Sequence, residues 1–200
     1  MSNKIIIHII IYGKGIVKNS FEGKYKIDKN TILETMLEIN NDIVNKNMTL
    51  FKKNLKLDNE KNLKCLLYAI DNEQQLRGMA KKSTGLILIF DPDEEESLMF
   101  VENIFNDFAK KNKTFDNLYI TIFANKKKET EITEKAKKFA DAKSIKYCDS
   151  PLNGEEKKFI EGIIKEIYNF NQNKKQEINQ TEDASEGNAK KSRDCCGCLK

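Results

Sequence analysis

A run of β-branched residues near the start of the chain constrains its fold most strongly. Residues 5–7 and 9–11 are all isoleucine, interrupted only by His8. The run is too short to span a bilayer and too apolar to form an exposed strand. We therefore expect a strand that is buried on both faces, as in a parallel sheet with helices above and below it. We interpret His8 as a satisfied residue of the same core.

A glycine-containing segment follows this strand at once. Residues 13–20 read G-K-G-I-V-K-N-S, and the phosphate-binding pattern of a strand–loop–helix unit is G-x-x-x-x-G-K-[ST]. Gly13 and Ser20 fit the pattern, and Gly15 adds to the flexibility of the turn. Lys18 stands at the position of the second glycine, and Asn19 stands at the position of the lysine. The segment thus has the scaffold of a phosphate-binding turn without its charge.

Composition limits the classes of protein to consider. The chain has 200 residues, which is enough for one domain and a tail, and its 35 basic and 31 acidic residues give a net charge of +4. Such a balance provides no field of one sign for nucleic acid, so we expect no nucleic-acid partner. No small-residue cleavage site follows the apolar run, which argues against a secretory signal. Five cysteines in an uneven arrangement do not form a secreted disulfide framework, and Cys65 and Cys148 are expected to be core residues.

Hydrophobic periodicity predicts strands that alternate with helices. The predicted strands are 5–11, 48–57 and 62–70 as a hairpin, 85–90, 118–123, and 144–148. The predicted helices are 32–44 after a capping box, 73–82, one with an apolar stripe over 98–108, 132–142, and a long one that includes 159–168. This order predicts an α/β fold with a mostly parallel six-stranded sheet and helices on both faces. Ligands of such sheets bind beyond the carboxyl ends of the strands.

The apolar pattern stops at Asn173. Beyond it the sequence is rich in Gln, Asn, Glu, Lys and Ser until a cluster of cysteines at the end. We therefore predict a domain over residues 1–172 and a disordered tail over residues 173–200.

The order of these segments resembles that of a Ras-superfamily small GTPase, and most closely that of a Rab. The pieces that carry the resemblance are the first strand with its glycine turn, the hairpin, A-I-D-N-E-Q-Q-L-R at 69–77, the strand 85–90 with Asp91, F-A-N-K at 123–126, Y-C-D-S-P-L-N-G-E at 147–155, a terminal helix and a cysteine-rich end. The resemblance covers residues 4–170. It implies a Ras-like P-loop NTPase fold with GTP or GDP and Mg²⁺ as cofactors, and with Ser20 as a magnesium ligand.

The second-switch motif departs from the family pattern D-T-A-G-Q-E. In that motif the Asp orients the magnesium shell and the Gln positions the attacking water. Here Ala69 stands at the Asp position and Glu73 at the Gln position. The first-switch threonine is either Thr31 or Thr35.

The base-recognition motif N-K-x-D keeps only its first half. Asn125 and Lys126 are retained, but Lys128 replaces the Asp that accepts hydrogen bonds from guanine, and Ser150 begins the counterpart of the S-A-K loop. Loss of such a buried polar partner can lower the discrimination between the correct ligand and its analogues by a factor of about 10⁴ to 10⁵. The missing phosphate-loop lysine and second-switch Asp each remove roughly 2–4 kcal/mol of stabilisation, by analogy with preorganised donors, so hydrolysis is expected to be very slow. Alternatively, Lys14 or Lys18 supplies the missing charge.

Three cysteines close the chain in a way that resembles the geranylgeranylation site of Rabs. Cys195, Cys196 and Cys198 do not form a C-a-a-X box, and a zinc site would need a fourth ligand that is missing locally. The tail has six basic and five acidic residues, a net charge of +1, so electrostatic attraction to an anionic membrane is weak. Attachment therefore requires lipid, and stable attachment requires two signals.

Taken with the resemblance, these features predict a membrane-attached regulator of vesicle trafficking. It would act as a module that binds effector or regulatory proteins, with weak or absent GTP binding and hydrolysis, in the cytosol or on the cytoplasmic face of an intracellular membrane. Two alternatives remain at the level of sequence. One is a functional GTP-hydrolysing switch with compensated motifs, and the other is a nucleotide-free subunit of a larger assembly.

Overall fold

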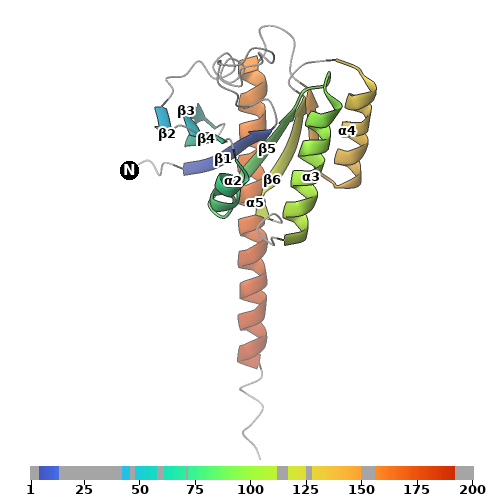
Figure 1. Cartoon of the computed structure of the whole chain (residues 1–200). Coiled ribbons are helices and arrows are strands. Elements are labelled where there is room, and N and C mark those ends of the chain that lie inside the picture. The colour runs from blue at the N-terminus through green and yellow to red at the C-terminus, as the bar shows by residue number, and fades with distance from the viewer. Residues whose placement is uncertain are drawn as a thin grey trace, which may run out of the picture.

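The computed structural model describes residues 5–13, 42–45, 48–57, 61–70, 72–111, 117–124, 128–149 and 156–191. The strands are β1 (Ile5–Gly13), β2 (Asp42–Asn45), β3 (Met48–Lys56), β4 (Asn62–Ile70), β5 (Gly85–Phe90), β6 (Tyr119–Ala124) and β7 (Lys146–Asp149). The helices are α2 (Glu73–Ala80), α3 (Glu95–Lys111), α4 (Glu131–Ala142) and α5 (Glu156–Lys191). Together they form an α/β fold around one sheet (Figure 1).

The sheet has the strand order β2-β3-β4-β1-β5-β6-β7. β1 pairs in parallel with β4 on one side and β5 on the other, and the β5–β6 and β6–β7 pairs are also parallel. β3 and β4 form an antiparallel hairpin, and β2 pairs antiparallel with β3. The mostly parallel sheet and the early hairpin are therefore confirmed.

The sheet has seven strands, one more than predicted, because residues 42–45 form β2. The predicted helix over 32–44 is wrong at its end, and the rest of it lies outside the described residues. Ile43 and Val44 are β-branched and fit a strand better than a helix. In addition, β3 offers unpaired backbone groups at its outer edge, and Ile43 pairs there with Thr49.

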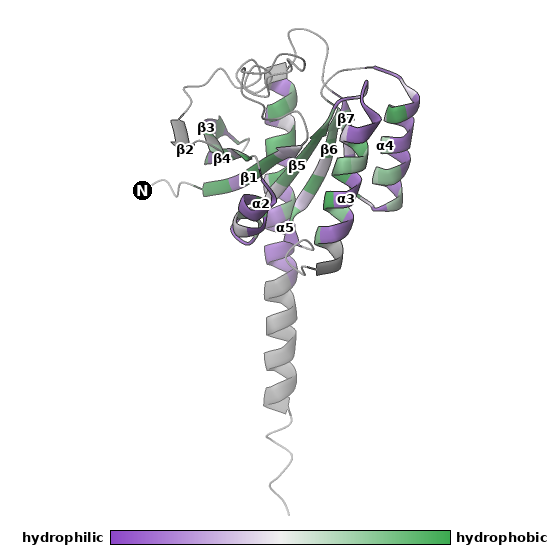
Figure 2. Ribbon diagram, in the orientation of Figure 1, coloured by the Kyte–Doolittle hydropathy of each residue, from purple (hydrophilic) through white to green (hydrophobic). Residues whose placement is uncertain are grey.

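Helices cover both faces of the sheet, as predicted. α5 packs on one face, and α2, α3 and α4 pack on the other. In β1 the fully buried Ile7, Ile9 and Ile11 contribute to the cluster under α5, while Ile10 contributes to the opposite cluster. From Ile9 onward the isoleucine run is buried on both faces. Figure 2 shows hydrophobic residues concentrated along β1, β5 and β6.

Two cysteines and one histidine were predicted to be core residues. Cys65 and Cys148 are buried in the cluster under α5, and burial raises the pKa of the Cys148 thiol to about 11, so both act as core residues. His8 differs from the prediction because it is only partly buried, and burial lowers its pKa. Its ring stacks on Tyr68, with 3.2 Å between Nδ1 and the phenol oxygen. On this face the neighbouring Ile6 is half exposed, so the core begins only at Ile10.

α5 joins the hairpin to the rest of the sheet and then continues beyond it. The Lys53 ammonium in β3 lies 3.0 Å from the Glu161 carboxylate in α5. Figure 1 shows that α5 extends past the sheet, and it runs to Lys191 through residues for which the sequence predicts a disordered tail. Lys174 and Glu177 are good helix formers, so a helix can continue where its apolar stripe has ended. Within the described residues, no helix is long and apolar enough to cross a membrane.

Candidate functional site at the carboxyl edge of the sheet

The strand order reverses at β1, and this reversal marks the crevice where α/β sheets bind ligands. β1 lies between β4 and β5, with Ile11 opposite Ala69 and Gly13 opposite Ile89. Because these strands are parallel, Gly13 and the residues that follow β4, β5, β6 and β7 meet at one edge. This is the edge at which the sequence predicts ligand binding.

The structure places two of the predicted site residues at this edge. Gly13 is the last residue of β1, and Glu73 is the first residue of α2, shortly after β4. The other predicted residues lie outside the described residues and stay predictions. They are Gly15, Lys18, Asn19, Ser20, Asn125, Lys126 and Ser150, and the cysteines Cys195, Cys196 and Cys198.

Ala69, which the resemblance aligns with a magnesium-orienting aspartate, is a core residue. Its side chain is fully buried and belongs to the cluster under α5. Its cross-strand neighbours are Ile11 in β1 and Thr49 in β3. A methyl group at this position offers no oxygen to a metal ion or to its water shell. This part of the edge therefore does not fit a Mg²⁺ site.

Glu73 is held by an ion pair along the surface of α2. Asn72 caps the helix, because its Oδ1 accepts a hydrogen bond of 2.9 Å from the backbone N–H of Gln75. One turn later, Arg77 Nε donates to Glu73 Oε1 at 3.0 Å, and the Arg77 guanidinium lies 4.8 Å from the centre of the Phe108 ring. The negative charge of the Glu73 carboxylate thus lies at the positive end of the helix dipole, where it is stabilising. This arrangement gives it a structural role at the start of α2.

The turn after β5 satisfies its own polar groups. The Asp91 N–H donates to Ser97 Oγ at 2.9 Å, and the Asp93 N–H donates to Asp91 Oδ1 at 2.9 Å. The fully buried Ser97 hydroxyl lies within 2.7 Å of the Glu94 carbonyl and 3.0 Å of the Asp91 carbonyl, to which it can donate. Sequence reasoning missed Ser97, although a serine between an acidic run and an apolar stripe is a recognisable helix-start signal.

Two contacts fasten the segment after β6 to the turn after β5. Lys128 forms an ion pair with Asp93, and Thr130 Oγ1 donates to the Pro92 carbonyl at 3.2 Å. Thr130 also caps α4 in a reciprocal arrangement with Thr133. Lys128, which the resemblance aligns with a guanine-recognising aspartate, directs its ammonium to a neighbouring loop. At this position the structure therefore has a loop-to-loop contact.

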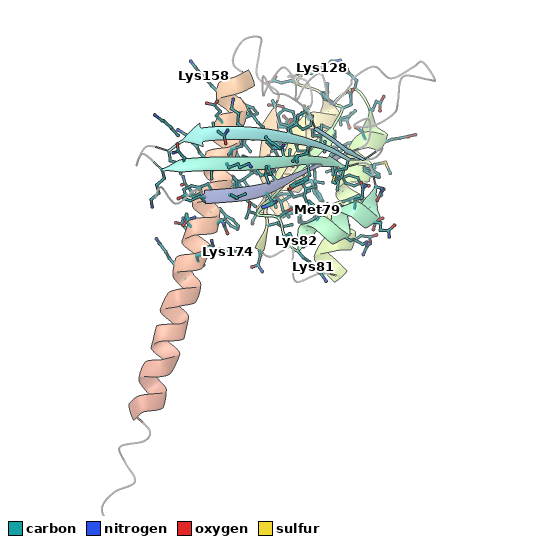
Figure 3. The ribbon with its side chains drawn as sticks, turned by 90° about the vertical axis from the view of Figure 1, so that its left-hand side faces the viewer. Met79, Lys81, Lys82, Lys128, Lys158 and Lys174 are labelled. Atoms are coloured by element: carbon teal, nitrogen blue, oxygen red, sulfur yellow. The ribbon has the colours of Figure 1, made fainter. Side chains whose placement is uncertain are left out.

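The described loops of this edge carry more acid than base. Their carboxylates belong to Asp91, Asp93, Glu94, Glu129 and Asp149. Figure 3 shows two lysines on this side, Lys128, which pairs with Asp93, and Lys158 near the start of α5. The Asp149 carboxylate accepts a hydrogen bond from the Tyr147 hydroxyl, and burial together with this bond raises the pKa of Tyr147.

Within the part of the chain that the structure describes, no three His, Cys, Asp or Glu side chains form a group that could hold a metal ion. The sequence matches no protein-family model and no curated protein.

Proposed function

We propose that this chain is a Rab-like member of the Ras superfamily that has become a partner-binding regulator of vesicle trafficking. It binds and hydrolyses GTP weakly or not at all, and lipid on its C-terminal cysteines attaches it to the cytoplasmic face of an intracellular membrane. The observation that carries the proposal is the buried methyl group of Ala69 at the carboxyl edge of an otherwise well-packed α/β sheet. In this proposal the α/β sheet of the family is retained, while the side chain that would support a magnesium ion is absent.

Two further contacts support the loss of hydrolysis. Glu73 at the glutamine position pairs with Arg77, and Lys128 at the aspartate position pairs with Asp93. Each of these side chains has acquired a structural partner within the fold. Preorganised donors and a metal ion are what accelerate phosphoryl transfer. Among the described residues, no three His, Cys, Asp or Glu side chains form a group that could hold a metal ion.

Nucleotide should not stabilise the protein. We expect about 1 mM GTP with Mg²⁺ to raise the free energy of unfolding by less than about 0.4 kcal/mol, the value for a Kd of that concentration. The measurement is thermal unfolding with GTP, GDP and ATP, with and without Mg²⁺, combined with native mass spectrometry of the purified protein. A stabilisation of several kcal/mol by guanine nucleotide alone would contradict the proposal. It would identify a functional switch in which Lys14 or Lys18 replaces the missing lysine.

Membrane attachment should depend on the C-terminal cysteines. We expect the full chain to sediment with membranes in cells, and a variant with Cys195→Ser, Cys196→Ser and Cys198→Ser to move to the soluble fraction, since the tail has a net charge of only +1. Fractionation and mass spectrometry of the C-terminal peptide provide the measurement. A matched control is Cys65→Ser, which changes a buried core thiol and leaves the tail intact. Wild-type protein that carries lipid and yet stays soluble would rule out this mode of attachment.

A further inference from the structure

The last helix, α5, leaves the sheet at its amino edge, opposite the carboxyl edge described above. β7 ends at the carboxyl edge, and α5 returns along one face of the sheet and ends at Lys191. On the way, the ring of Phe170 packs edge to face on the ring of Tyr119, the first residue of β6, with 5.4 Å between the ring centres. Figure 1 shows the helix projecting beyond this edge.

The first part of α5 is anchored in the fold. Near the amino edge, Glu166 accepts a hydrogen bond of 2.8 Å from the Tyr119 hydroxyl and pairs with Lys146 of β7. Two turns later, the Lys174 ammonium still lies 3.5 Å from the amide oxygen of Asn117, just before β6. The helix is therefore held on the domain as far as Lys174. Its buried side chains belong to Ile160, Ile163, Ile164, Ile167 and Tyr168.

Beyond Lys174 the helix continues as a projecting segment, residues 175–191. The side chains of Lys175, Gln176 and Glu177 are exposed, and the backbone stays helical to Lys191. At a rise of 1.5 Å per residue, the projecting segment is about 26 Å long. The three C-terminal cysteines follow it in the sequence.

The projecting segment can stay helical because it extends a helix that is already formed. Nucleation is the costly step of helix formation, and residues added to the end of a docked helix avoid that cost. The segment contains no proline, and 10 of its 17 residues are Lys, Gln, Glu or Ala, which are good helix formers. Ile178 is its only large apolar residue, so it has no apolar stripe for packing on the domain or on a second helix.

We propose that the projecting segment is a stiff spacer, which holds the C-terminal membrane anchor about 26 Å or more from the amino edge of the sheet. A helical linker keeps its ends apart, whereas a flexible chain of the same length would let the anchor return to the domain. Because α5 leaves at the amino edge, the carboxyl edge lies on the far side of the domain from the anchor. A partner protein can then reach the carboxyl edge without meeting the bilayer. The inference rests on the proposed lipid attachment and adds a geometry to it.

The distance between two spin labels tests the stiffness of the projecting segment. The labels are attached at Lys175→Cys and Lys190→Cys in a full chain whose three C-terminal cysteines are replaced by serine. Cys65 and Cys148 are buried, and burial raises the pKa of both thiols, so they do not compete for the label. We expect a narrow distribution of distances centred near about 22 Å, the helical rise between the two positions.

Two replacements of equal length provide the controls. A Gly-Ser sequence in place of residues 178–188 should broaden the distribution to that of a flexible chain. A helical Glu-Ala-Ala-Ala-Lys repeat at the same residues should keep it narrow. A wild-type distribution as broad as that of the Gly-Ser chain would overturn the inference, because the projecting segment would then be flexible already.

A supported bilayer that contains maleimide lipids tests the spacing. The wild-type chain couples to these lipids through its C-terminal cysteines, so the measurement needs no lipidation in cells. Neutron reflectometry should show a hydrated layer of about 26 Å between the headgroups and the domain in the wild type and in the helical replacement, and a thinner layer in the Gly-Ser chain. A wild-type domain that rests on the headgroups would overturn the spacer even if the label distances were narrow.

These measurements keep the inference apart from the proposed function. Protein isolated from cells without lipid on its C-terminal cysteines would contradict the proposed function, and both measurements would stand unchanged. A broad distribution of label distances would contradict the spacer, and lipid attachment would stand.

Discussion

Replacing Ala69 with aspartate should destabilise the fold by about 3–5 kcal/mol, the cost of an uncompensated charge in a core. The substitution restores the acid that the Ras-like motif has at this position. In this chain, however, the side chain is fully buried in the cluster under α5, between Ile11 and Thr49 on the neighbouring strands. Urea unfolding at neutral pH measures the loss. We expect no added stability from Mg²⁺ with GTP.

The pH dependence of Ala69→Asp stability distinguishes the effect of the new charge from the effect of the larger side chain. Burial would raise the pKa of the new carboxyl above its usual value of about 4, so the acid would stay neutral in the folded state at low pH. The loss in free energy of unfolding caused by Ala69→Asp should therefore grow as the pH rises through and above that value, and shrink in mildly acidic solution. Ala69→Asn, which has a similar shape and no charge, is the matched control and should show a smaller loss without this pH dependence. An Ala69→Asp variant that is as stable as wild type, and that gains stability from Mg²⁺ with GTP, would contradict our assignment of Ala69 to the core.

The parts of the fold that the sequence predicted well are those whose environment is dictated locally. The isoleucine run was predicted to be a strand buried on both faces, and β1 is buried on both faces from Ile9 to Tyr12. The hairpin was predicted at 48–57 and 62–70, and β3 and β4 occupy nearly the same residues because turn residues separate two runs of strand-forming residues. β2 was missed because what makes residues 42–45 a strand is the free edge of β3, which a local pattern does not contain. α5 was predicted to end where its apolar stripe ends, although helix formation itself does not require that stripe.

The candidate site, like the fold, could be predicted only in part. The sequence predicted that ligand-binding residues lie beyond the carboxyl ends of the strands, and Gly13 and Glu73, two of the candidates, lie at that edge. The partners of the altered residues could not be predicted. Lys128 pairs with Asp93 across 35 positions of sequence. Charge signs could be read from the sequence, but which charges share an edge follows only from the assembled sheet.

The docking of α5 should be disrupted by one methyl group at Gly85. Gly85 begins β5 and lies directly beneath Ile167 of α5. A Cβ added at Gly85 would lie 2.8 Å from Ile167 Cδ1, 3.0 Å from its Cγ2 and 3.2 Å from its Cγ1. Ile167 is fully buried and β-branched, so its Cγ2 has little freedom to move away. We expect Gly85→Ala to lower the free energy of unfolding by about 1–3 kcal/mol, as overpacked cores do. Denaturant unfolding measures this loss.

A second substitution tests whether the clash with Ile167 is the cause. Ile167→Ala alone should cost about 2–5 kcal/mol because it leaves a cavity under α5. It also removes all three atoms that the new Cβ would meet, so Gly85→Ala in this background should be nearly neutral or slightly stabilising, since the methyl group then fills part of the cavity. The double-mutant cycle should therefore give a coupling of about 1–3 kcal/mol between the two positions. Gly162→Ala is the matched control, since its Cβ would meet nothing within 4 Å and alanine favours a helix, so this change should be neutral or stabilising. Additive losses at Gly85 and Ile167 would show that β5 and α5 do not approach each other as closely as the structure places them.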